Sequence, residues 1–131
     1  MSFFSPQFSL NLYLTLGEIM SEWVLLLGGS TGHGAATAKR LAKDGYGIIA
    51  FHFDRGEAKK IAEETIDEVT GLTNGRCHYF NTNAASEDAM KTYIPKIREI
   101  TAGSQLKLLL HSIAFGTTTN FFGDKPVTQR Q

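Results

Sequence analysis

The sequence is poor in the features that mark secreted, membrane-spanning and nucleic-acid-binding proteins. Cys77 is the only cysteine among 131 residues, so no disulfide can form within the chain, and a reducing cytoplasm is the expected location. No apolar run approaches the ~20 residues that a membrane helix requires, so no membrane partner is expected. The formal net charge is zero, which gives no reason to expect nucleic acid as a partner.

Two further absences concern metal ligands and the N-terminus. His52, Cys77 and His78 lack a second pair of ligands at a matching spacing, so no metal site is predicted. The first 19 residues contain no Lys or Arg, unlike the start of a signal peptide. Met20 stands just before the first long apolar run. We therefore predict that residues 1–19 are an extension, non-native or disordered, and that residues 20–131 form one domain.

The most informative stretch is residues 23–34, Trp-Val-Leu-Leu-Leu-Gly-Gly-Ser-Thr-Gly-His-Gly. A continuous apolar run over 23–28 predicts a strand that is buried on both faces. A glycine-rich turn follows, and a helix is expected over 34–44. Such a turn directs backbone N–H groups and the helix N-terminus at one point, which attracts phosphate. The predicted phosphate-binding residues are Gly28, Ser30, Thr31, Gly32, His33 and Gly34, with the two hydroxyls as additional donors.

The rest of the chain repeats the same alternation of strand and helix. Strands are expected over 47–53, 76–80 and 106–111, and helices over 57–69 and from the cap Ser86 to about residue 100. Gly71 and Asn74-Gly75 should end the second helix, and Pro95 predicts a kink or a late start in the third. Repeated βα units with right-handed crossovers predict an α/β fold with a doubly wound parallel sheet of the Rossmann type.

A second candidate site follows the second predicted strand. Asp54 lies twenty residues after Gly34, where a dinucleotide fold contacts the adenosine ribose. An acidic residue there favours NAD, whereas a basic residue favours the 2′-phosphate of NADP. Asp54 and Arg55 stand side by side, so the cofactor is NAD or NADP. The alternative is an exposed Asp-Arg-Gly turn that only opens the next helix.

These motifs resemble those of the short-chain dehydrogenases/reductases. The glycine loop is similar to that family's Thr-Gly-x-x-x-Gly-x-Gly loop, with Leu27 in place of Thr. Asn83 occupies the place of an Asp that contacts adenine. The segment 111–115 occupies the place of the family's Asn-Asn-Ala-Gly motif and resembles a His-Ser-Ile-Ala-Phe run of its enoyl-reductase branch. The resemblance implies further cofactor contacts, to adenine and to the nicotinamide ribose, at Asn83, Ala84, His111, Ser112 and Ile113.

The resemblance implies an NAD(P)-dependent oxidoreductase that moves a hydride between nicotinamide and a small carbonyl or enoyl substrate. It also implies a homo-oligomer for the full-length protein. The family's catalytic Ser, Tyr and Lys have no match here, so no catalytic residue is assigned. Residues 128–131 form a helix-capping pattern at the chain's end. We therefore expect the chain to stop before the catalytic half and to be inactive alone.

Two other functions stay open at this point. A non-catalytic sensor of NAD(P) could use the same glycine loop. A methyltransferase also has a glycine loop after its first strand and an acidic residue that binds the ribose of S-adenosylmethionine. The spacing of the three glycines, with Ser30 and Thr31 between them, favours the dinucleotide over S-adenosylmethionine.

Overall fold

The computed structural model describes residues 22–113, 118–119 and 126–127. Predictions about residues 1–19, the start at Met20 and the capping pattern at 128–131 lie outside the described residues.

A parallel sheet has the strand order β3-β2-β1-β4. Its strands are β1 (Trp23–Leu27), β2 (Gly47–His52), β3 (Cys77–Asn81) and β4 (Leu106–His111). A separate antiparallel pair joins β5 (Thr118–Thr119) to β6 (Pro126–Val127).

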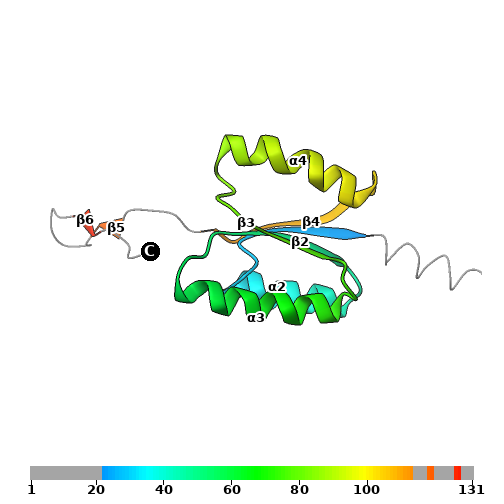
Figure 1. The fold of residues 1–131 in the computed structure, drawn as a ribbon, viewed down its shortest axis with the longest axis horizontal. Coiled ribbons are helices and arrows are strands. Elements are labelled where there is room, and N and C mark those ends of the chain that lie inside the picture. Colours follow the sequence, from blue (N-terminus) through cyan, green and yellow to red (C-terminus); the bar gives the residue numbers. More distant parts are fainter. Residues whose placement is uncertain (1–21, 114–117, 120–125, 128–131) are drawn as a thin grey trace, which may run out of the picture.

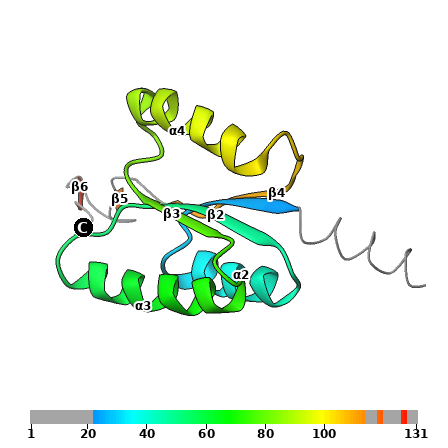
Figure 2. The same cartoon turned by 45° about the vertical axis from the view of Figure 1, so that its right-hand side comes forward.

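Helices cover both faces of the parallel sheet. Figures 1 and 2 show α2 (Gly32–Lys43) and α3 (Glu57–Leu72) on one face and α4 (Glu87–Thr101) on the other. The chain moves outward from β1 to β3 and then returns to place β4 on the far side of β1. This arrangement confirms the predicted doubly wound α/β fold. Ligands of such sheets bind at the carboxyl ends of the strands, where the strand order reverses.

The central strand β2 shows how the two faces divide the core. All six of its residues are buried. Ile48 and Ala50 pack in the cluster that contains α2 and α3 residues, while Ile49 and Phe51 pack in the cluster that contains Ile97 of α4. Because side chains alternate along a strand, His52 continues the face of Ile48 and Ala50. No helix among the described residues is long and apolar enough to cross a membrane.

Two helix ends differ from the sequence prediction by two or more residues. α2 begins at Gly32, one half-turn earlier than predicted. Gly71 does not end α3, which continues to Leu72; the chain turns instead at Asn74 (φ 52°) and Gly75 (φ 83°). A glycine inside a helix costs only about 1 kcal/mol relative to alanine, which tertiary packing can offset. The prediction that Gly71 breaks the chain was therefore wrong.

The third helix begins where its cap predicts. The Ser86 Oγ accepts a hydrogen bond from the backbone N–H of Ala89, and α4 starts at Glu87. The helix runs through Pro95, so the alternative of a late start was wrong. The strands match the prediction to within one residue at each end.

β4 forms one edge of the parallel sheet. Its side chains are unusually exposed for an apolar strand, and Leu109 is 61% accessible. Within the described part of the chain, β1 is the only strand paired with β4. Among the described residues β4 is therefore an edge strand of this sheet.

Candidate functional site

The loop between β1 and α2 depends on glycine at two positions. Gly28 has φ +93°, and a Cβ there would lie 2.5 Å from the backbone oxygen of Ser112. A Cβ on Gly34 would lie 1.6 Å from the backbone oxygen of Gly28. The first turn of α2 therefore reaches the end of β1 only because residue 34 has no side chain.

The N-terminus of α2 is not capped by a side chain of its own segment. Thr31 is the N-cap, but its side chain makes no capping hydrogen bond, and the first turn contains no acidic residue. By contrast, α4 has a Ser86 cap and two acidic residues in its first turn. The first N–H groups of a helix need partners and carry partial positive charge. The N-terminus of α2 is therefore available to an anion.

A pocket of about 220 Å³ lies at the carboxyl ends of the strands. Four segments that are far apart in the sequence line it: the glycine loop, the end of β2, the residues after β3 and the residues after β4. Ser112 is held beside the loop by a 2.7 Å hydrogen bond from its N–H to the Leu27 oxygen. The predicted site residues in the pocket lining are Gly28, Ser30, Thr31, Asp54, Asn83, Ala84, Ser112 and Ile113.

The remaining predicted site residues lie around this pocket and not in its lining. All three glycine-loop residues that remain lie in the first turn of α2: Gly32 and His33 are exposed, and Gly34 is buried. The guanidinium of Arg55 stacks 4.6 Å from the ring centre of Phe53. His111 lines a second hollow of about 260 Å³, which shares Ala84 and Ile113 with the first.

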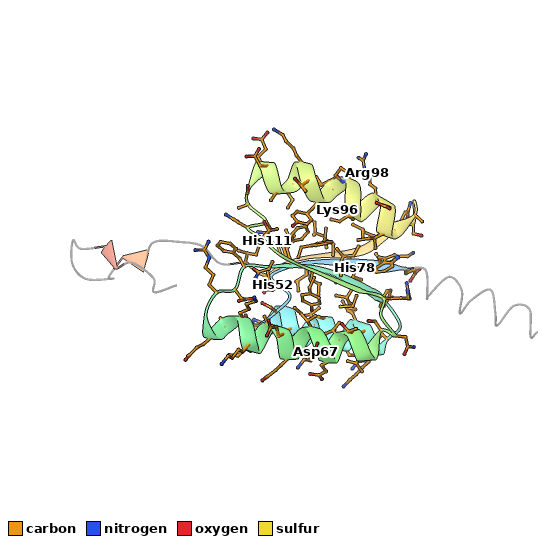
Figure 3. The ribbon with its side chains drawn as sticks, in the orientation of Figure 1. His52, Asp67, His78, Lys96, Arg98 and His111 are labelled. Carbon is orange, nitrogen blue, oxygen red and sulfur yellow. The ribbon has the colours of Figure 1, made fainter. Side chains whose placement is uncertain are left out.

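The Asp54 carboxylate lies at the centre of a small polar cluster. Its Oδ2 atom accepts a 2.6 Å hydrogen bond from the Ser30 hydroxyl and lies 2.7 Å from Nδ1 of His52. The side chains of Asp54 and His52 are only 14% and 6% exposed. Figure 3 labels His52, whose ring lies toward the α2 and α3 side of the sheet. Because the Ser30 proton is used by Asp54, Thr31 is the loop hydroxyl that can still donate to an anion.

The backbone of Asp54 is also fixed, by the end of the neighbouring strand. The Asn81 side chain accepts from the Asp54 N–H at 3.2 Å and donates to the Asp54 oxygen at 3.1 Å. One residue later, the N–H of Thr82 donates to the His52 oxygen at 2.8 Å. β3 therefore holds the segment after β2 at the rim of the pocket.

Tyr79 of β3 holds the glycine loop in place through a hydrogen bond. Its hydroxyl donates a 3.0 Å hydrogen bond to the backbone oxygen of Gly29. Burial, with a smaller contribution from Cys77, raises the pKa of the Tyr79 hydroxyl. A hydroxyl that stays protonated keeps donating to the loop, so this contact persists across the physiological pH range.

We expect Tyr79→Phe to destabilise the fold by about 1–2 kcal/mol, because the Gly29 oxygen loses its donor. The raised folded-state pKa means that the tyrosine's contribution is complete below its ordinary value of about 10 and is lost as the pH rises further. Urea unfolding of the parent chain and of Tyr79→Phe, at neutral pH and at about pH 10.5, measures the difference in their free energies of unfolding. The stability difference should shrink at the higher pH; a difference that grows there would contradict the assignment.

Sequence reasoning missed three residues of this site: His52, Tyr79 and Asn81. His52 was considered only as a metal ligand. Strand alternation could have identified it, because it shares a face with Ile48 and Ala50 and follows them at the strand's end. Tyr79 and Asn81 gave no signal of their own, because their roles depend on which strand lies beside β2.

The chain is similar to known proteins in sequence and in fold. Residues 22–124 match the family of short chain dehydrogenases. Among solved structures, the chain is similar to a short chain dehydrogenase from Bacillus anthracis, with 20% identity and a TM-score of 0.53. That similarity covers 70% of this chain and 35% of the other, so this chain spans about a third of its length. No curated protein matches the chain. Because the family match covers most of its residues, this chain belongs to the short chain dehydrogenase family.

Proposed function

We propose that this chain binds NAD(H) or NADP(H) at the carboxyl edge of its parallel sheet. In this proposal the pyrophosphate lies on the N-terminus of α2 and the adenosine lies in the pocket between the ends of β1 and β2. The nicotinamide ribose lies toward the hollow lined by His111 and Ile113. The observation that carries the proposal is the uncapped N-terminus of α2 beside the pocket.

The residues present fit such a cofactor. A side chain on Gly28 or Gly34 would fill space that the backbone occupies. The N–H groups of Gly28 and Gly29 donate to the Phe51 oxygen, so the phosphate oxygens would meet the N–H groups that follow, at the N-terminus of α2. Thr31 adds a hydroxyl donor at the rim. Asn83 and Ala84 line the same pocket from the β3 side, where the adenine would lie.

We further propose that NAD(H) is preferred over NADP(H) at neutral pH. Asp54 lines the pocket, and its carboxylate would accept hydrogen bonds from the ribose hydroxyls and repel a 2′-phosphate. Arg55 is outside the lining and stacks on Phe53, so it does not offset the charge of Asp54 inside the pocket.

The whole protein would then be an oxidoreductase that acts on a small carbonyl or enoyl substrate. The nicotinamide supplies or accepts the hydride, and the protein orients it. The sequence contains no Tyr-x-x-x-Lys pair to donate a proton to the substrate oxygen. We therefore propose that residues 1–131 alone hold the cofactor without turnover, and that the full-length protein is a homo-oligomer.

Thermal unfolding with NADH, NADPH and S-adenosylmethionine tests the binding proposal. A nucleotide at ten times its Kd should stabilise the fold by about 1.4 kcal/mol. For a domain of this size that corresponds to a rise in Tm of roughly 5–10 °C. We expect NADH to give the larger rise at neutral pH and S-adenosylmethionine to give none. A cooperative transition that neither dinucleotide shifts would overturn the proposal.

A single variant can distinguish loss of phosphate binding from loss of stability. Thr31→Asp places a carboxylate at the N-cap of α2, which should stabilise the free protein by about 0.3–1 kcal/mol. The same charge should repel the pyrophosphate and weaken NADH binding by about tenfold or more. Higher stability together with weaker binding is the expected pair of results. Unchanged NADH affinity in this variant would place the pyrophosphate elsewhere.

A further inference from the structure

We infer that His52 is a specificity-determining residue for the cofactor, and that its protonation state sets how strongly the pocket discriminates against a 2′-phosphate. The inference rests on the proposed dinucleotide site. It concerns a residue that lies outside the glycine loop and outside the Asp-Arg pair from which cofactor choice was predicted.

The geometry couples His52 directly to Asp54. Nδ1 of His52 lies 2.7 Å from the same Oδ2 that accepts the Ser30 hydrogen. Neither His52 Nε2 nor Asp54 Oδ1 has a hydrogen-bond partner among the described residues. Both residues line the pocket. The pair therefore offers a ligand one nitrogen and one carboxylate oxygen that have no partner in the described part of the chain.

Other charged and titratable groups near this pair are few. On its own segment, Arg55 stacks on Phe53. On β3, the Tyr79 ring lies 5.9 Å from the His52 ring, and burial raises the pKa of Tyr79. His33 and Glu57 are exposed in the first turns of α2 and α3. Within the described residues, Asp54 is the only ionisable group that forms a hydrogen bond or ion pair with His52.

The net charge of the His52–Asp54 pair therefore depends on whether the His52 imidazole is protonated. With His52 neutral, the pair carries one negative charge, which suits two ribose hydroxyls and opposes a phosphate. An imidazole ordinarily gains its proton between about pH 8 and pH 5. With His52 protonated, the pair is neutral overall, and Nε2 becomes an N–H donor instead of an acceptor. A falling pH should therefore weaken the discrimination against NADPH.

The pH dependence of this discrimination is measured by the Kd values of NADH and NADPH for the 131-residue chain at about pH 8 and pH 6. The ratio of NADPH to NADH Kd should fall by about tenfold or more toward pH 6. The 2′-phosphate itself gains a proton near pH 6, which contributes to that fall. His52→Asn is the control, because an Asn amide can replace Nδ1–H as donor to Asp54 and does not titrate. We expect the variant to retain only the phosphate's smaller contribution.

A measurement on the unaltered protein makes the test independent of how the variant folds. If protonation of His52 favours NADPH, reciprocity requires bound NADPH to raise the pH at which the His52 ring gains its proton, relative to bound NADH. NMR of the labelled imidazole reports that midpoint. Equal midpoints, or equal pH dependence in His52→Asn and the parent chain, would overturn the inference while leaving the dinucleotide site intact. Absence of binding by both nucleotides at either pH would instead overturn the proposed function.

Discussion

Gly34→Ala should abolish the cooperative unfolding transition of this chain or destabilise it by more than about 4 kcal/mol. The new methyl group would lie 1.6 Å from the backbone oxygen of Gly28, which no side-chain rearrangement can relieve. α2 would have to move away from β1, and the packing of Ala38 and Ala42 on the sheet would be lost with it. Effects of this size are exceptional for single substitutions and mark a backbone collision or a lost core. Chemical denaturation followed by circular dichroism measures the change.

Two other glycines of the chain serve as matched controls for that experiment. Gly71 lies inside α3 with open space around it, so Gly71→Ala should stabilise the protein by about 0.5–1 kcal/mol. Gly32 also has open space but a φ of +55°, so Gly32→Ala should cost about 1–2 kcal/mol. If Gly34→Ala changed the stability as little as either control does, the result would contradict the close approach of α2 to β1.

Asp54→Ala should have the second largest effect, on stability and on binding together. The Ser30 hydroxyl and His52 Nδ1, both in nearly buried side chains, would lose their shared acceptor. An unsatisfied buried donor costs about 1–3 kcal/mol. Hydrogen bonds to a charged group contribute about 1.5–3 kcal/mol, so loss of the ribose acceptor should weaken NADH binding by about 10–100-fold. Denaturant unfolding and NADH titration measure the two effects separately.

Asp54→Asn separates the charge of the carboxylate from its shape. The amide keeps one acceptor oxygen and nearly the same volume, so the loss of stability should be smaller than in Asp54→Ala. Removal of the negative charge should at the same time narrow the gap between NADH and NADPH affinity. An Asp54→Ala protein that bound NADH as tightly as the parent would show that Asp54 only ties the loop to β2.

Much of the fold could be predicted because local patterns and tertiary structure agree. The apolar run before Gly28, the capping Ser86 and the alternation of strand and helix each indicate the element that forms. Gly71 was misjudged because its local cost is small, whereas Ala62, Thr65 and Val69 bury one side of the same helix. Packing over several turns outweighs one unfavourable residue.

The site was predictable in its outline but not in its internal contacts. Glycine spacing and the position of Asp54 indicate a pocket, and the structure places most of the predicted residues in one lining. The bond between Ser30 and Asp54 joins residues 24 positions apart, and Asn81 reaches Asp54 across 27 positions. Such contacts depend on the strand order, which no local pattern specifies.

The central claim is that a dinucleotide binds across the ends of β1 and β2 with its pyrophosphate at α2. Titration of the ¹⁵N-labelled chain with NADH, followed by backbone amide shifts, tests this most directly. The largest shifts should fall on residues 28–34, on Asp54 and on Ser112, and Thr31→Asp should suppress those of the loop. Shifts confined to other surfaces, or none at saturating NADH, would contradict the claim and remove the basis for the proposed oxidoreductase.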